Sequence, residues 1–563
     1  MMQFACAVRE GADGFCHADD DLGPWMRLSH LSLTNHKSVP DLRIDIREHL
    51  VLIGANETGK STLLRLLDAA FNGDIGRLYS LLAPESLRDP DQPILLTVTV
   101  DDLTGADKAL FADEVEVTGD GRHTLVLQVR AEIDPIADDV EIGRHIRKKM
   151  AEPRTVGSRR LRQLGLTFLP AGRSPDRELS RGRTSALRSL LSGVDLGADA
   201  ADLEARLAEL HELLDGAAAV DKLRTEVAGA LQQLTPRDVS SDDVTVRLGA
   251  SPTGGILDNA EVRLRDGASE RSLTRQSDGF RAMATVAVQV LAQDGTAVLC
   301  VDEPETHLHP TAQRRMGRLL RDGRHQAIVA THSPEVLAQF DPMHVVVLTG
   351  FGASRQLEDD PFTGNDKGYL RWWRGERLEP MTARSVLLVE GLADRIMAAA
   401  VAEVLGLDLD RAGVSLVEYG GGNEFELAIR LFGRSGFGVP LVILGDADAE
   451  SKIADFLDVE VGELRDHDVR MCAQDLEDQY VRDLGPSRVH AMLKTAGAFS
   501  SKQLTELDAS SAYDMLTFCG HKKRKVHAAT SVASELTEDE ARSLSPIVEA
   551  LELALERARA VAP

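Results

Sequence analysis

Two groups of residues could perform phosphate chemistry, and they lie in different halves of the 563-residue chain. In the N-terminal half, GANETGKS at 54–61 has the pattern GxxxxGK[ST], in which backbone N–H groups, a lysine and a hydroxyl surround the phosphates of a nucleotide. In the C-terminal half, Glu390, Asp394, Asp446 and Asp448 follow apolar runs. Carboxylates held close together repel one another unless cations neutralise them, so this set predicts an oxygen-ligated Mg²⁺ or Mn²⁺ site.

The predicted nucleotide site is larger than its glycine-rich motif, which follows a predicted strand at 49–53 and precedes a predicted helix. A second hydrophobic strand, at 296–301, runs into Asp302 and Glu303. Asp302 can hold Mg²⁺ through water, and Glu303 can orient or deprotonate the attacking water. Further along, IVATHS places His332 at the end of another strand, near the γ-phosphate. The residues expected to bind the nucleotide are Gly54, Asn56, Gly59, Lys60 and Ser61 of the motif and Thr62 directly after it.

Three apolar runs are expected to position the carboxylates. SVLLVEG ends in Glu390, SLVEYGGG leads into a glycine turn at 420–422, and PLVILGDAD ends in the Asp446 pair. Strand-like and helical runs alternate here and over most of the chain, which indicates an α/β fold with parallel sheets. Sites in such sheets form at the carboxyl ends of the strands, so we expect the carboxylates to meet at one edge.

The remaining segments suggest how the chain is divided. From Met26, the residues up to 46 alternate like two strands joined by a turn, whereas residues 1–25 are polar and aperiodic and predict a disordered extension. The Ala/Leu/Glu-rich stretch at 186–234 predicts a helical hairpin, either an ordinary core pair or an exposed dimerisation arm. A Gly-, Asp-, Arg- and Trp-rich stretch at 350–381 has the composition of a linker and places the main boundary near residue 380.

Charge and composition limit the classes of partner. The net charge of −26 gives no global attraction to nucleic acid, so DNA contact would need a local basic surface. The stretch 144–188 has thirteen Arg or Lys against three Asp or Glu, and HKKRK at 521–525 is a second cluster; each is either a solvated face or a phosphate-contacting surface. Five scattered cysteines favour a reducing, cytoplasmic setting. The longest apolar run is too short to span a bilayer, so no membrane association is expected.

Several segments resemble the ABC-type ATPases of the RecF and structural-maintenance-of-chromosomes kind: VDEPETHLHP, IVATHSP and RQSDGFR. In that family, an S-x-G segment at a helix N-terminus completes the ATP site of a partner subunit. The resemblance implies this role for Ser277 and Gly279, places Lys37 near the nucleotide, and implies a homo-oligomer, either a dimer or a tetramer. Gln276 departs from the small or apolar residue that the family has before the serine.

The C-terminal pattern E-G-x-x-D, GGG, D-x-D is similar to a Toprim domain. A Toprim domain after an ABC-type ATPase is typical of the OLD (overcoming lysogenization defect) nucleases, which include the nuclease subunit of the Gabija antiphage system. The resemblance adds Glu477 as a metal ligand and Lys525 as the lysine that offsets charge on the phosphate. Lys522 and Lys523 are rivals of Lys525 for that role.

The resemblance also implies how two metal ions would be shared. Glu390 and Asp394 would hold one ion, Asp446 and Asp448 would lie between the ions, and Glu477 would bind the other. Such a pair activates water for phosphodiester hydrolysis. Ser61 and Asp302 would bind the separate Mg²⁺ that accompanies ATP.

We therefore expect an extension at 1–25, an ABC-type ATPase domain at 26–375 with the helical insertion, and a Toprim domain at 381–563 with a C-terminal helical part. The expected function is an ATP-binding, metal-dependent endonuclease acting on double-stranded DNA in antiphage defence, with a helicase-like protein as a candidate partner. The alternative is a regulatory ATPase of a defence complex whose Toprim domain binds a partner without cutting.

Overall fold

The computed structural model describes most of the chain. The described residues fall into two compact units, one within 1–168, 297–304 and 317–563 and the other within 169–296 and 305–316. The described ranges are 26–55, 58–119, 121–134, 139–148, 151–171, 263–266, 269–275, 277–292, 296–349, 353–363, 368–373, 378–420 and 424–560, with scattered positions between 197 and 241.

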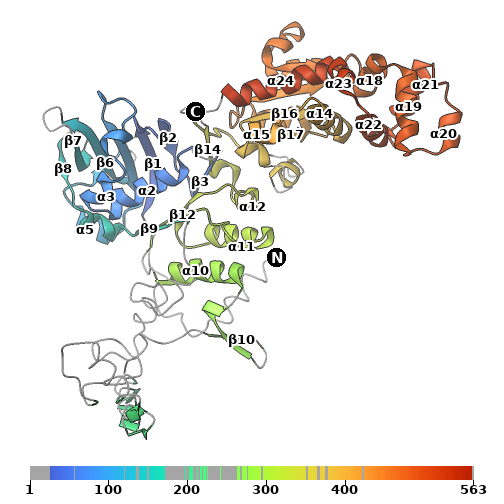
Figure 1. The fold of residues 1–563 in the computed structure, drawn as a ribbon. Helices are drawn as coiled ribbons and strands as arrows, with labels where there is room; N and C mark the ends of the chain where they lie inside the picture. The colour runs from blue at the N-terminus through green and yellow to red at the C-terminus, as the bar shows by residue number, and fades with distance from the viewer. Residues whose placement is uncertain are drawn as a thin grey trace. The chain divides into compact units, whose positions relative to one another are not determined.

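The N-terminal part begins with an antiparallel sheet in the order β2-β1-β4-β6-β7-β8, with β5 beside β6 (Figure 1). The predicted strand pair after Met26 is confirmed, because β1 and β2 are antiparallel neighbours. Leu31 and Leu33 alternate into the core with no exposed surface. The bounds are β1 (Arg27–Thr34), β2 (Leu42–Asp45), β4 (Ile94–Asp101), β5 (Glu116–Val117), β6 (His123–Asp134), β7 (Asp139–Lys148) and β8 (Ala151–Thr155).

A second sheet, in the order β15-β14-β3-β13-β12-β9, carries the nucleotide-binding motif. Its neighbours β14, β3, β13 and β12 run parallel, and every residue of β3, β12 and β13 is buried. Such fully apolar strands are typical of parallel sheets covered on both faces. The bounds are β3 (Leu50–Ile53), β9 (Leu166–Leu169), β12 (Val298–Asp302), β13 (Gln326–Ala330), β14 (Val345–Thr349) and β15 (Ala353–Gln356).

Three buried or half-buried histidines lie near the amino ends of these parallel strands. The rings of His49 and His344 pack edge to face at 5.5 Å, and the Ala327 N–H donates to His49 Nδ1 at 3.1 Å. Burial lowers the pKa of all three, and lowers that of His325 to about 4. The folded protein therefore holds these rings neutral under conditions in which the unfolded chain protonates them.

This histidine group predicts acid sensitivity. Below an unfolded pKa of about 6.5, the unfolded chain binds protons that the folded protein excludes, so stability is lost as the pH falls from about 6.5 towards 4. We expect the melting temperature to drop by several degrees over this range, and the drop to be smaller in His325→Gln. Thermal unfolding followed by circular dichroism measures both, and an identical pH dependence of the two proteins would contradict the assignment.

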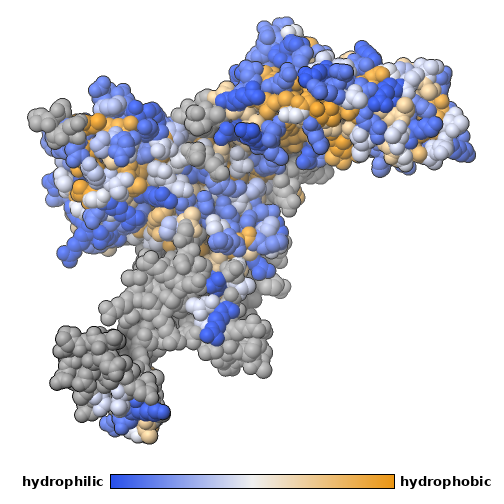
Figure 2. Space-filling model, viewed as in Figure 1, coloured by the Kyte–Doolittle hydropathy of each residue, from blue (hydrophilic) through white to orange (hydrophobic). Residues whose placement is uncertain are grey.

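The C-terminal part is built on a parallel sheet in the order β17-β16-β18-β19 (Figure 1). Helix α24 packs against these strands, and α14 packs against β17, α22 and α24. On the face drawn in Figure 2, hydrophobic residues reach the surface beside α24 among hydrophilic ones. The bounds are β16 (Ser385–Val389), β17 (Val414–Glu418), β18 (Leu441–Gly445), β19 (Val469–Met471), α14 (Leu392–Val404), α22 (Lys525–Ala533) and α24 (Ser545–Ala560).

The other helices cover the sheets or form the C-terminal helical part. In the first unit they are α2 (Lys60–Asn72), α3 (Ile75–Tyr79), α4 (Gly105–Leu110), α5 (Ser158–Leu161), α12 (Pro334–Leu337), α15 (Leu409–Ala412), α16 (Glu424–Phe432), α17 (Glu450–Leu457), α18 (Leu476–Leu484), α19 (Pro486–Ala496), α20 (Ser501–Thr505), α21 (Ala512–Cys519) and α23 (Glu538–Ser543). Helix α11 (Pro310–Arg321) begins in the second unit and ends in the first.

The second unit contains the hairpin β10 (Arg263–Asp266) and β11 (Ser269–Ser272), followed by α10 (Asp278–Ala292). The predicted insertion at 186–234 lies largely outside the described residues, and the predicted extension at 1–25 lies wholly outside them. Among the residues that the structure describes, no helix is both long and apolar enough to cross a membrane.

The described residues of the stretch expected to be a linker are packed into the fold instead. It contains β15, which pairs with β14, and two tryptophans with no exposed surface. The Trp373 indole N–H donates to the Phe340 carbonyl at 2.9 Å, and its ring stacks on Phe437. Trp372 packs edge to face on Phe432. Burying two large aromatic surfaces outweighs the turn-forming composition that suggested a linker.

Candidate functional site

The glycine-rich motif forms a tight loop between β3 and α2. Gly59 has φ 88°, a left-handed conformation that favours glycine, and a Cβ there would meet the Ser38 carbonyl oxygen at 2.5 Å. The Lys60 ammonium group donates to the carbonyls of Gly54 at 3.0 Å and Ala55 at 2.8 Å. The lysine and the amino end of α2 therefore face the same loop, the arrangement that binds phosphates.

Strand order brings the other predicted ATPase residues to this loop, because β3, β13 and β12 are adjacent and parallel. The Ser61 hydroxyl donates to Asp302 Oδ1 at 2.8 Å. Glu303 follows with φ 44°, a strained backbone conformation of the kind that clusters at active sites. His332 lies two residues beyond β13, and burial and the nearby Lys60 charge lower its pKa.

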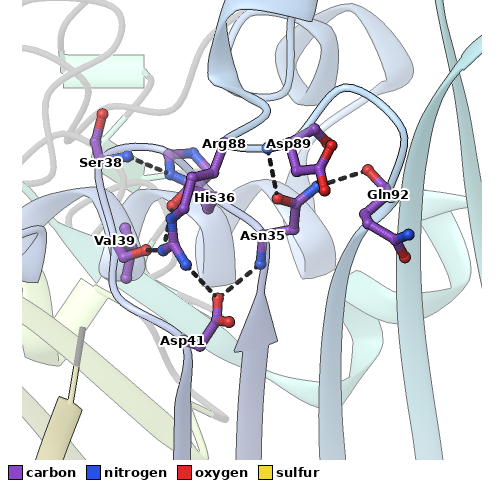
Figure 3. Close-up of polar contacts among 8 residues, drawn as sticks. All are labelled: Asn35, His36, Ser38, Val39, Asp41, Arg88, Asp89 and Gln92. Atoms are coloured by element: carbon purple, nitrogen blue, oxygen red, sulfur yellow. Dashed lines mark hydrogen bonds and ion pairs between the residues drawn. The ribbon is translucent and has the colours of Figure 1, made fainter.

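A polar network braces the loop at 35–41 against this motif (Figure 3). The Arg88 guanidinium donates to the carbonyls of His36 at 2.9 Å and Val39 at 2.8 Å, and to Asp41 at 3.0 Å. Asn35 ties the loop to the 89–92 turn. A Cβ on Gly59 would also meet Val39, so the 35–41 loop packs directly against the phosphate-binding loop. The hydrogen bonds that hold the 35–41 loop therefore also help to position the phosphate-binding loop.

We expect Arg88→Ala to weaken ATP binding without abolishing it. Loss of three hydrogen bonds frees the braced loop, and a cost of one to two kcal/mol corresponds to about a tenfold rise in the ATP dissociation constant. Fluorescent-nucleotide titration measures it, with Arg43→Ala as the control because Arg43 is exposed on the adjacent strand β2. Equal affinities of wild type and Arg88→Ala would refute the bracing role.

For the other residues predicted to bind the nucleotide, the structure gives the position but few side-chain contacts. Ser277 is exposed at the start of α10, as the motif predicts, and its carbonyl accepts from the Arg281 N–H. Gly279 lies in the first turn of the same helix. The Lys37 N–H donates to the Ser86 carbonyl within the braced loop, whereas Asn56 lies outside the described residues.

The predicted carboxylates meet at the carboxyl edge of the C-terminal sheet. Glu390 directly follows β16, and Asp394 lies in the first turn of α14, where it accepts the Gly391 N–H at 3.1 Å. Asp446 directly follows β18, and Asp448 lies in the turn after it. Because β16 and β18 are parallel neighbours, both pairs lie at the same edge.

The pKa shifts of these carboxylates indicate that the groups lie close enough to repel one another. Burial raises the pKa of Asp394 to about 6, with a smaller contribution from Glu390. Burial also raises the pKa of Asp446, and the charges of Asp394 and Glu390 raise it further. A site that makes ionised carboxylates this unfavourable is suited to bind a cation.

Lys525 is the lysine that reaches this cluster. Its ammonium group lies 3.0 Å from the Glu477 carboxylate, whereas Lys522 and Lys523 are exposed. Glu477 is 1% exposed, and burial raises its pKa to about 7 although Lys525 opposes the shift. The expected metal ligand Glu477 is therefore, in this structure, the ion-pair partner of the lysine.

The donor set fits a hydrated divalent ion. Among the residues that the structure describes, no three Asp, Glu, His or Cys side chains come close enough to enclose a metal ion by themselves. Mg²⁺ usually keeps several waters and takes only one or two protein carboxylates, so it needs no closed cage. Its one or two protein ligands would come from the cluster formed by Glu390, Asp394, Asp446 and Asp448.

Sequence reasoning missed two neighbours of this cluster. Asp475 caps α18 by accepting the Asp478 N–H at 2.7 Å, and its charge raises the pKa of Asp446 and Glu477. An aspartate just before a helix is a recognisable cap signal. Tyr419 also lies beside the carboxylates, and only its place before the glycine turn could have drawn attention to it.

The described part of the basic stretch at 144–188 is divided between side chains that contact the fold and side chains that face solvent. Arg144 is buried and donates to a carbonyl just after α2 at 2.7 Å. Arg160 pairs with Glu114 at 2.7 Å, and Arg162 donates to the last carbonyl of α2 at 2.9 Å. Arg144 and Arg162 therefore cap the helix after the phosphate-binding loop. Arg147, Arg154 and Arg159 are exposed, so a phosphate-contacting surface on this stretch stays a prediction.

Two family models match the chain. The first, described as "AAA domain, putative AbiEii toxin, Type IV TA system", matches residues 50–338, more than half of the chain. The chain belongs to this AAA-domain family. The second, the Toprim domain of overcoming-lysogenization-defect-like proteins, matches residues 381–448, which include all four strand-end carboxylates. The predicted combination of an ABC-type ATPase domain with an OLD-like Toprim domain is therefore confirmed, as is the α/β fold class.

Individual proteins are similar to all or part of this chain. An OLD nuclease of Thermus scotoductus is 22% identical over 75% of this chain and 82% of its own length. The C-terminal region of an OLD protein from Xanthomonas campestris pv. campestris is 25% identical, with a TM-score of 0.26, over 31% of this chain and 97% of that one. An SMC head domain from Thermotoga maritima is 14% identical, with a TM-score of 0.29, over 58% of this chain and 97% of that one.

Proposed function

We propose that this AAA-domain protein is a divalent-metal-dependent DNA endonuclease whose Toprim domain cuts and whose ATPase domain gates the cutting. The observation that carries the proposal is the meeting of four strand-end carboxylates and Lys525 at one sheet edge. A group of this composition has no evident structural use, since burying like charges is costly. We take the domains as residues 26–375 and 381–563.

Each residue of the cluster has a role in phosphodiester hydrolysis. When bound, the divalent ion supplies an activated water and neutralises phosphate charge. Carboxylates of the cluster formed by Glu390, Asp394, Asp446 and Asp448 would hold the cation at the sheet edge. Although burial opposes it, the neighbouring carboxylates together raise the pKa of Lys525, so this lysine stays protonated and can face charge developing on the phosphate.

The ATPase residues support hydrolysis of ATP. Lys60 and the amino end of α2 would bind the phosphates, and Ser61 with Asp302 would hold the accompanying Mg²⁺. Glu303 would orient the attacking water. We further propose that Ser277 completes the site of a second copy, which makes the active form a homo-oligomer, and that the activity serves antiphage defence.

Cleavage by the chelator-treated wild-type protein tests the function. Short duplex DNA should remain intact in EDTA, and Mg²⁺ or Mn²⁺ should restore cutting to products with 3′-hydroxyl and 5′-phosphate ends. The duplex should be supplied with and without ATP, because ATP is expected to set the rate. Intact DNA in every metal and nucleotide condition would favour the regulatory ATPase that binds a partner without cutting.

A further inference from the structure

A buried tyrosine hydroxyl faces the carboxylate cluster without a partner. Tyr419 is 2% exposed, and its hydroxyl has no hydrogen-bond partner among the residues that the structure describes. Leaving a buried hydroxyl unpaired costs free energy, and phenylalanine would fill the same space without that cost. A functional use of the hydroxyl at this position would explain why a tyrosine is present.

The backbone holds Tyr419 directly beside Glu390. Strands β17 and β16 are parallel, with Glu418 opposite Val389, and the ladder continues one step beyond both strands. The Tyr419 N–H donates to the Val389 carbonyl at 2.9 Å, and the Gly420 N–H donates to the Glu390 carbonyl at 2.7 Å. Neither residue can shift along the sheet without breaking these bonds.

Aromatic packing fixes the ring from the other side. The Tyr419 and Phe425 rings pack edge to face with centroids 4.6 Å apart, and Phe425 is itself buried. Phenylalanine at 419 could keep this contact, because it involves the ring and not the hydroxyl. The hydroxyl can therefore be removed while the ring stays in place.

The surrounding charge shows what this hydroxyl can do. Burial raises the pKa of Tyr419, and the charges of Glu390, Asp446, Asp394 and Asp448 raise it further, in that order after burial. Even with its ordinary pKa of about 10, a phenol is protonated at neutral pH. Next to carboxylates, a protonated phenol serves as a hydrogen-bond donor.

We propose that Tyr419 is a positioning residue of the Toprim site, whose hydroxyl is unpaired among the described residues of this structure and donates to the Glu390 carboxylate when a cation is bound, which orients that carboxylate. The inference rests on the proposed metal-dependent function. A neutral donor can fix one carboxylate oxygen without adding positive charge that would compete with the ion. Lys525 contacts Glu477 and adds positive charge to the site. The Tyr419 hydroxyl adds no charge and instead orients a carboxylate.

Calorimetric titration of Mn²⁺ into chelator-treated protein tests this inference without DNA. The binding heat that is lost in Asp446→Asn defines the Toprim site. Loss of one hydrogen bond to a charged group should raise the Mn²⁺ dissociation constant of Tyr419→Phe about tenfold. Tyr513→Phe is the matched control, because Tyr513 is 77% exposed in the same domain, and it should bind Mn²⁺ as wild type does.

Thermal unfolding separates positioning from support of the fold. Without metal, Tyr419→Phe should melt at or above the wild-type temperature because an unpaired buried hydroxyl is removed, and Mn²⁺ should stabilise it less than wild type. An unchanged dissociation constant, or an equal loss of stability with and without Mn²⁺, would overturn the inference. Wild-type protein that binds Mn²⁺ but cuts no DNA would refute the proposed function only, and the titration would still decide the role of Tyr419.

Discussion

Lys60→Ala should bind ATP at least a hundredfold more weakly than wild type, because charge-assisted hydrogen bonds to the β- and γ-phosphates are lost in a preformed loop. The Lys60 ammonium group already lies among the carbonyls of that loop, so its position does not depend on a rearrangement. Titration with a fluorescent ATP analogue measures the loss. Lys108→Ala is a suitable control, since Lys108 lies in α4 of the same domain and takes no part in the site.

Glu303→Gln provides the complementary result. Glutamine keeps the size of the side chain but cannot accept a proton, so this variant should bind ATP normally and hydrolyse it at least a hundredfold more slowly. Hydrolysis at the wild-type rate would show that Glu303 does not act on the attacking water. Nucleotide binding and phosphate release measured on one preparation separate the two effects.

Asp446→Asn should cut DNA several orders of magnitude more slowly than wild type. The substitution removes a negative oxygen from the centre of the carboxylate cluster, and metal activation of water is worth several kcal/mol. The change should leave the fold intact and raise stability in the absence of metal, because it relieves repulsion from Asp394 and Glu390.

Two comparisons make the Asp446→Asn result specific. Asp455→Asn changes an exposed carboxylate on α17 of the same domain and should cut as wild type does. ATP hydrolysis should persist in Asp446→Asn because Lys60 and Ser61 lie on α2 and Asp302 ends β12 of a different sheet. Asp446→Asn protein that still cuts at the wild-type rate would eliminate the carboxylate cluster as the cutting site.

Strand-end residues were the part of both sites that could be predicted from sequence. Glu390, Asp446 and Asp302 each end an apolar run, and parallel strands bring such positions to one edge regardless of how the helices pack. The fold class followed from the same alternation of strands and helices. The geometry around those edges needed the structure.

Residues whose roles depend on tertiary partners could be assigned from sequence only through a resemblance, as for Lys525, or not at all. Lys522, Lys523 and Lys525 are neighbours in the chain, and only the placement of α22 brings one of them to Glu477. Arg144 belongs to a basic stretch that suggested a surface, but its side chain is buried against the end of α2. A charge count does not show whether an arginine faces solvent or a helix terminus.

The burial of several aromatic side chains could not be predicted from the sequence either. Trp372 and Trp373 lie in a stretch with the composition of a linker, yet both are fully buried. Tyr419 precedes a glycine turn, and the sequence did not indicate a role for it. The proposed role of its hydroxyl depends on carboxylates that follow two other strands.

The most direct test of the account measures ATP hydrolysis and cleavage of supercoiled plasmid on the same preparations of wild type, Glu303→Gln and Asp446→Asn, in Mg²⁺ and in Mn²⁺. The account predicts that wild type performs both reactions, that Asp446→Asn hydrolyses ATP but leaves the plasmid intact, and that Glu303→Gln loses ATP hydrolysis while retaining Mn²⁺ binding at the Toprim site. Plasmid left intact by wild type in both metals, or cut equally by Asp446→Asn, would contradict it.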